Sequence, residues 1–74
     1  MTCYIKIETV EDLQKFMNLA WNSPMDVGVH TKDNQIADGK SVLGLMAIDY
    51  ERPVMVVTED ERLVKQLRPW MVEG

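Results

Sequence analysis

Ser41 is the residue of this chain whose local sequence best fits a site of chemical modification. It lies in the segment GKSVLGLM, residues 39–46, where a glycine and a lysine precede a short apolar run. A serine at a helix N-cap accepts a hydrogen bond from a free backbone N–H group, and the same N–H groups and the helix dipole stabilise a phosphate attached there. The segment therefore predicts a regulatory phosphorylation site at Ser41. An ordinary N-cap is the alternative interpretation.

The apolar run after Ser41 offers a candidate binding surface. Its spacing predicts a short helix that ends at about Ile48, and apolar residues cover most of the circumference of that helix. Part of this apolar surface should therefore face solvent, where adaptable methionine side chains suit partner binding. The candidate partner-binding residues are Lys40, Val42, Leu43 and Met46. A simple core stripe is the alternative interpretation.

The other residues with reactive side chains are isolated in the sequence. His30 is the only histidine and Cys3 the only cysteine, so neither has a partner at the spacing of a metal site or of a nucleophile and its base. The acids of residues 59–61 are consecutive, which fits the start of a helix better than a pair of catalytic carboxylates. We therefore predict no enzyme activity, no catalytic residue, no metal site and no cofactor.

Composition limits the class of protein. A chain of 74 residues is one domain, residues 1–74, and with 46% apolar and 27% charged residues we expect a compact fold. The single cysteine excludes an internal disulfide and favours a reducing compartment. No stretch is long and apolar enough to span a bilayer, and the first residues do not resemble a signal peptide. We expect a cytoplasmic protein that does not bind membranes.

The charge argues against one class of partner. The formal net charge is −4, and the eight lysine and arginine residues are dispersed along the chain rather than clustered. An acidic surface repels the phosphate backbone of nucleic acids. We therefore expect protein partners and no nucleic acid.

Hydrophobic periodicity predicts seven elements in the order β-α-β-β-α-β-α. Apolar residues alternate in the strands, recur at helical spacing in the helices, and are interrupted by Pro, Asn, Asp and Gly residues at the turns. The predicted ranges are a strand over 3–8, a helix over 10–21, strands over 25–31 and 35–37, a helix over 41–48, a strand over 54–58, and a helix from about 59 that Pro69 ends or kinks near Leu67 or Arg68.

These elements imply two layers. Amphipathic helices and half-apolar strands in this order favour an α+β fold, with three helices on one face of a four-stranded, mostly antiparallel sheet. Trp21 and Trp70 lie near helix ends, where we expect packing at the edge of the core, with an interface as the alternative. The predicted core consists of Ile5, Ile7, Leu13, Phe16, Val27, Val29, Leu45, Leu63 and Leu67.

The segment around Ser41 resembles the regulatory-serine helix of HPr, the phosphocarrier family of the bacterial sugar phosphotransferase system. In that family a G-K-S sequence precedes an apolar run similar to V-L-G-L-M, and the element order also matches the open-faced β-sandwich of HPr. The motif match covers Asp38 to Ile48. The resemblance implies a single HPr-like domain that acts in sugar transport or in carbon catabolite regulation.

The phosphate-carrying histidine of that family is absent at its expected place. Thr9 stands near the histidine position, Glu11 near the arginine position and Asp12 near the proline position. A threonine phosphoester is too stable to pass its phosphate on, and nearby acids repel a phosphate. We therefore expect no phosphocarrier cycle. The chain is more similar to regulatory HPr homologues that lack the histidine and keep the serine.

The resemblance implies protein partners. They are a serine kinase of the HPr type, which would modify Ser41, and a catabolite-control transcription regulator, which would bind the helix after it. The alternative is a small interaction domain with an HPr-like fold, unrelated to sugar transport, in which Ser41 is only an N-cap.

Overall fold

A computed structural model describes residues 1–73 of the chain. It contains five strands, three α-helices and one 3-10 turn. In chain order these are β1 (Thr2–Ile5), α1 (Val10–Trp21), β2 (Val27–His30), β3 (Ile36–Asp38), α2 (Val42–Ala47), β4 (Val54–Thr58), α3 (Glu61–Gln66), η1 (Arg68–Trp70) and β5 (Met71–Val72).

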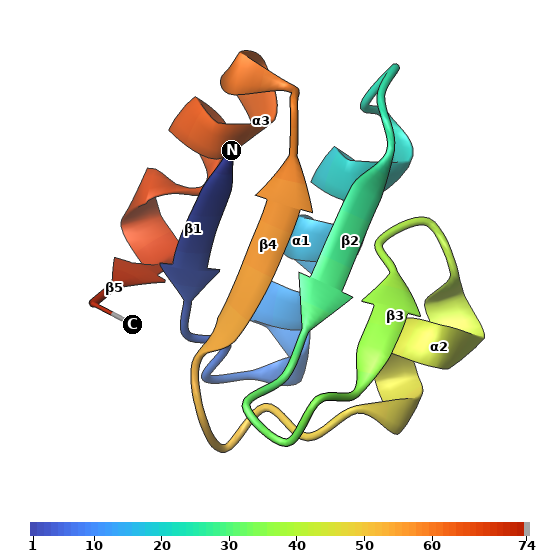
Figure 1. The fold of residues 1–74 in the computed structure, drawn as a ribbon, viewed down its shortest axis with the longest axis vertical. Helices are drawn as coiled ribbons and strands as arrows, with labels where there is room; N and C mark the ends of the chain where they lie inside the picture. Colours follow the sequence, from blue (N-terminus) through green and yellow to red (C-terminus); the bar gives the residue numbers. More distant parts are fainter. Residues whose placement is uncertain (74) are drawn as a thin grey trace.

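The strands form one antiparallel sheet in the order β3-β2-β4-β1-β5 (Figure 1). The expected sheet had four strands, so the strand count was wrong by one. Helix α3 ends at Gln66, close to the predicted end near Leu67 or Arg68, and Pro69 lies in η1. This turn reverses the chain, so that Met71 and Val72 pair with β1 instead of continuing a helix.

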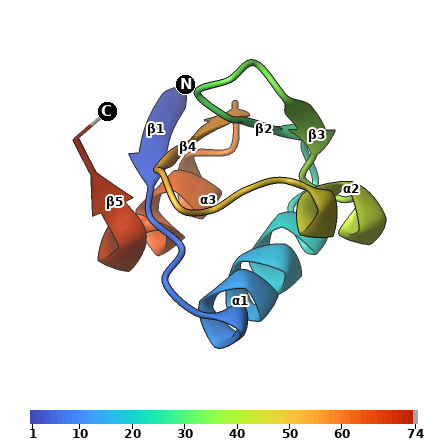
Figure 2. The ribbon, with the colours of Figure 1, turned by 90° about the horizontal axis from the view of Figure 1, so that it is seen from below.

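The helices lie on one side of the sheet, as Figure 2 shows, with α1, α2 and α3 beneath the strands. The predicted α+β architecture with a single helical layer is therefore confirmed. Strand β4 shows the two layers in its alternation, because Val54, Val56 and Thr58 are buried while Met55 and Val57 are partly exposed on the other face.

The core lies between the helical layer and the sheet. Eight of the nine predicted core residues are buried, and Leu13 is half-buried against them. Phe16 of α1 is its largest fully buried side chain. The buried hydrophobic residues are Ile5, Ile7, Phe16, Ala20, Val27, Val29, Ala37, Leu45, Val54, Val56, Leu63 and Leu67.

Several element boundaries match their sequence signals. Helix α1 has the predicted range, and the Thr9 side chain accepts the Asp12 N–H at its N-terminus. Strand β1 ends three residues earlier than expected. Its last paired residue, Ile5, stands opposite Val54, and the residue before Val54 is Pro53, which has no N–H to extend the ladder.

Candidate functional site

Ser41 is the N-cap of α2, as predicted. Its backbone is extended, and its Oγ accepts the Gly44 N–H at 3.2 Å. Gly44 makes room for this bond, because a Cβ at position 44 would lie only 3.1 Å from the Ser41 Oγ. The glycine that weakens the helix intrinsically therefore accommodates the capping serine. Ser41 as a whole is partly exposed.

Helix α2 buries only one of its apolar side chains fully. Leu45 points into the core, whereas Val42, Leu43 and Met46 are 51%, 85% and 64% exposed. A core stripe is therefore the wrong interpretation for these three residues. They form a contiguous apolar surface beside Ser41, and such surfaces are typical of binding sites.

Trp21 extends this surface onto α1. It is the last residue of that helix and is 65% exposed. A hollow of about 330 Å³ separates it from α2, lined also by Met17, Val42 and Leu45. We call Trp21, Ser41, Val42, Leu43 and Met46 together the Ser41 face. The expectation that Trp21 packs at the core edge was wrong, because the helix ends with its indole beyond the buried residue Ala20.

Gly39 fixes where α2 begins relative to the sheet. Its N–H donates to the Val27 carbonyl at 2.6 Å, and a Cβ at position 39 would come within 2.6 Å of the Val27 Cγ1. Only glycine allows this close approach. The hairpin of β2 and β3 therefore leads directly into the capped helix.

Lys40, which was predicted to contact partners, makes two hydrogen bonds within the chain. Its Nζ donates to the Ser23 carbonyl at 2.7 Å, and its N–H donates to the Asp38 Oδ1 at 2.9 Å. The ammonium group is therefore bound to the turn that follows α1. Lys40 also lines the hollow next to Trp21. Its main contact links the segment before α2 to the turn after α1.

The C-terminal end of α2 is held by Tyr50. Its phenol O–H donates to the Leu45 carbonyl, which is one of the carbonyls a helix end leaves free. Burial of the ring raises the pKa of Tyr50 to about 12. The phenol therefore remains a neutral donor over the ordinary pH range.

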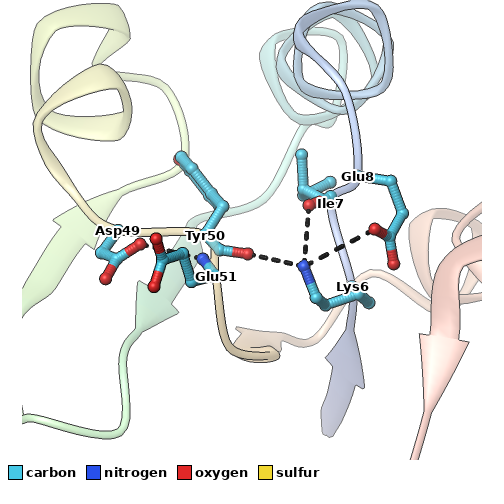
Figure 3. A network of polar contacts seen from close by, with 6 residues as sticks. All are labelled: Lys6, Ile7, Glu8, Asp49, Tyr50 and Glu51. Carbon is cyan, nitrogen blue, oxygen red and sulfur yellow. Dashed lines mark hydrogen bonds and ion pairs between the residues drawn. The ribbon is translucent and has the colours of Figure 1, made fainter.

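Lys6 connects the loop of Tyr50 to the loop before α1 (Figure 3). Its Nζ donates to the Tyr50 carbonyl at 2.8 Å and to the Ile7 carbonyl at 3.2 Å, and lies 3.9 Å from the Glu8 Oε2. One ammonium group thus joins segments that are 44 residues apart in the chain. Sequence reasoning did not find this contact, because Lys6 looks like an ordinary exposed residue of a strand.

Thr9, at the expected place of the carrier histidine, has a structural task. Its Oγ1 accepts the Asp12 N–H at 3.0 Å, and Glu8 and Glu11 beside it are exposed acids. These acids repel an incoming phosphate. The Thr9 Oγ1 therefore caps α1 with exposed carboxylates close by.

Cys3 and Asp60 are two further residues with reactive side chains. Cys3 is half-buried, and desolvation raises the pKa of its thiol, with a smaller opposing effect from the N-terminal charge, so it is less nucleophilic than a free thiol. Asp60 caps α3, and the Ser23 hydroxyl, followed by two backbone N–H groups, lowers its pKa. Within residues 1–73, no group of three His, Cys, Asp or Glu side chains is placed to hold a metal.

Comparisons with protein-family models, with curated proteins and with solved structures gave no match. Among the described residues, no helix combines the length and the apolar character that crossing a membrane requires.

Proposed function

We propose that this chain is a non-enzymatic, HPr-like regulatory module that binds other proteins through the Ser41 face, in sugar phosphotransferase or carbon catabolite control. The observation that carries the proposal is the exposure of Val42, Leu43 and Met46 on a helix held firmly at both ends. A surface that is apolar, exposed and rigid loses little conformational entropy on binding.

The hollow beside Trp21 adds shape to this surface. At about 330 Å³ it has room for a large apolar side chain of a partner, and Trp21 supplies an aromatic wall. Interfaces are enriched in tryptophan and methionine. Lys40 lines the same hollow, and its ammonium group connects the segment before α2 to the turn after α1.

Phosphorylation of Ser41 would switch this binding. The modification adds a charge of about −1.5 to −2 beside Val42 and Leu43. Because the ammonium group of Lys40 donates to the Ser23 carbonyl, the phosphate would depend on backbone N–H groups and on a basic group supplied by the partner. A partner with an arginine at this place would bind more tightly after phosphorylation.

The experiment compares two methionine variants. Binding of an HPr-type serine kinase and of a catabolite-control regulator is titrated with the parent chain, with Met46→Asp and with Met25→Asp. Met25 is 47% exposed but lies in the turn before β2, so it provides the matched control. We expect Met46→Asp to weaken binding at least about tenfold, a loss typical for a buried interface anchor, and Met25→Asp to bind as the parent does.

The kinase also tests whether Ser41 is a regulatory site or only an N-cap. If the kinase and ATP add phosphate to the parent and not to Ser41→Ala, the regulatory form holds. If neither partner binds the parent, the link to carbon control is wrong.

A second candidate is an interaction domain in which Ser41 is only a cap. The Ser41 Oγ bond to Gly44 and the separate engagement of Lys40 favour it, because both groups already have structural tasks. Under this candidate Met46→Asp still weakens the binding of a partner, and Ser41 stays unmodified by the kinase.

A further inference from the structure

The sheet has a second face, which is free of helices. Figure 1 looks onto this face, and Figure 2 shows the helices on its opposite side. A shallow hollow of about 110 Å³ on this side, lined partly by Tyr4, His30 and Met55, is open to solvent. We call this helix-free face of the sheet the open face. The strand register assigns to it Thr2, Tyr4, Gly28, His30, Ile36, Asp38, Met55, Val57 and Val72.

One row of this face crosses every strand. The register pairs Ile36 with His30, His30 with Met55, Met55 with Tyr4, and Tyr4 with Val72. By chemical type the row is aliphatic, ring, methionine, ring, aliphatic. It therefore reads the same from either edge of the sheet, with Met55 of β4 at its centre.

The open face is also nearly free of charge. Asp38 is the only one of these nine residues with a formal charge, and Lys32 is a further charged residue that lines the hollow beside them, whereas 27% of the whole chain is charged. Depletion of charge together with methionine and aromatic residues is typical of the centre of an interface. The net charge of −4 repels two copies in every orientation, and a face with one charged residue adds little to this repulsion at close contact.

We propose that the open face binds a second copy of this chain, in a two-fold dimer whose axis runs parallel to the strands and passes over β4. This operation places β3 over β5 and β2 over β1 of the other copy. Ile36 then lies opposite Val72, His30 opposite Tyr4, and Met55 opposite its own counterpart. Sheets that pack face to face with aligned strands are a common arrangement.

The same two-fold rotation also brings the residues of the neighbouring row together without a clash of large side chains. It consists of Asp38, Gly28, Val57 and Thr2. Gly28, which has no side chain, then faces Thr2, and Val57 faces its own counterpart. Asp38 belongs to the edge strand β3, so its carboxylate lies at the corner of the interface, next to solvent.

The size of the face limits the strength of this dimer. The molecule measures 26 × 26 × 23 Å, so the face buries at most roughly 700 Å² per copy, against about 800 Å² in a stable interface. We therefore expect a weak dimer, below the size of a stable interface, that forms only at high protein concentration. Added salt should strengthen the dimer, because it screens the repulsion between two copies of charge −4.

Sedimentation equilibrium of the full chain, at concentrations from about 10 µM to about 1 mM, tests this proposal. Met55→Lys brings two ammonium groups together at the axis and should raise the dissociation constant at least about tenfold. Met46→Lys makes the same substitution on the Ser41 face and should leave it unchanged. His30→Lys, opposite Tyr4, should weaken the dimer also, and serves if Met55→Lys fails to fold.

A parent chain that stays monomeric at the highest concentration would overturn the proposal. A dimer that resists both Met55→Lys and His30→Lys, or one that Met46→Lys disrupts, would overturn it as well. None of these results bears on the binding of a kinase or regulator to the Ser41 face, so the two proposals fail independently.

Discussion

At the scale of single residues, the capping groups define where α2 begins and ends. Ser41 accepts a backbone N–H at one end, and Tyr50 donates to the Leu45 carbonyl at the other. Only the Ser41 cap could be predicted from the sequence. Serine before an apolar run is a recognised N-cap signal, whereas nothing local to Tyr50 indicates that its phenol turns back to a carbonyl five residues earlier.

Replacing Ser41 should measure how much the N-cap hydrogen bond contributes to the free energy of unfolding. Ser41→Ala removes the acceptor for the Gly44 N–H and should lower the free energy of unfolding by about 1 kcal/mol. Ser41→Asp keeps an acceptor and should stay close to the parent. Urea denaturation of the three chains provides the measurement. Equal stability of Ser41→Ala and the parent would mean that the bond contributes nothing.

Tyr50 should make stability sensitive to alkaline pH. Because its pKa is raised from 10 in the unfolded chain to about 12 in the fold, its contribution is fully present below pH 10 and is lost as the pH rises towards 12. Tyr50→Phe lacks the titrating group while both chains share all other titrations. The free energy of unfolding should therefore fall more steeply between pH 10 and 12 in the parent, and equal slopes would contradict the assignment.

At the scale of elements, periodicity located the helices and strands, and tertiary contacts decided their ends. The ranges of α1 and β4 agree with the prediction because their apolar patterns are long or strongly β-branched. The strand β5 was missed because Met71 and Val72 are too few to show a period. Their pairing depends on η1 turning the chain back to β1, which is a property of the fold rather than of the segment.

Lys6 holds two loops at a fixed distance, and its removal should show this. Lys6→Met keeps the apolar stem but leaves the carbonyls of Ile7 and Tyr50 without their donor. The expected loss in the free energy of unfolding is about 1–3 kcal/mol. Lys15→Met is the control, because Lys15 is exposed and its Nζ lies as far as 4.0 Å from the Glu11 Oε1. An exposed ion pair of this kind contributes about 0–1 kcal/mol. Thermal denaturation of both variants provides the measurement. Equal losses of stability in the two variants would mean that the Lys6 contacts do not stabilise the fold.

At the scale of the whole molecule, two faces of different character lie on opposite layers. The helical layer carries the Ser41 face, and the sheet carries the open face. Sequence reasoning found Val42, Leu43 and Met46, since a short helix with apolar residues around it cannot bury them all. It named an interface at Trp21 only as the alternative to packing at the core edge. It did not find the symmetry of the row through Met55, because that symmetry depends on which strands become neighbours.

The central claim is that partners bind the Ser41 face, and mapping the contact by NMR tests it most directly. The ¹⁵N-labelled chain is titrated with an HPr-type serine kinase, and the amide signals of residues 41–47 and the indole N–H of Trp21 are followed. The account predicts that these signals shift or broaden while those of Tyr4, His30 and Met55 keep the positions they have at the same concentration without kinase. Shifts confined to the open face, or none at all with the kinase in excess, would contradict it.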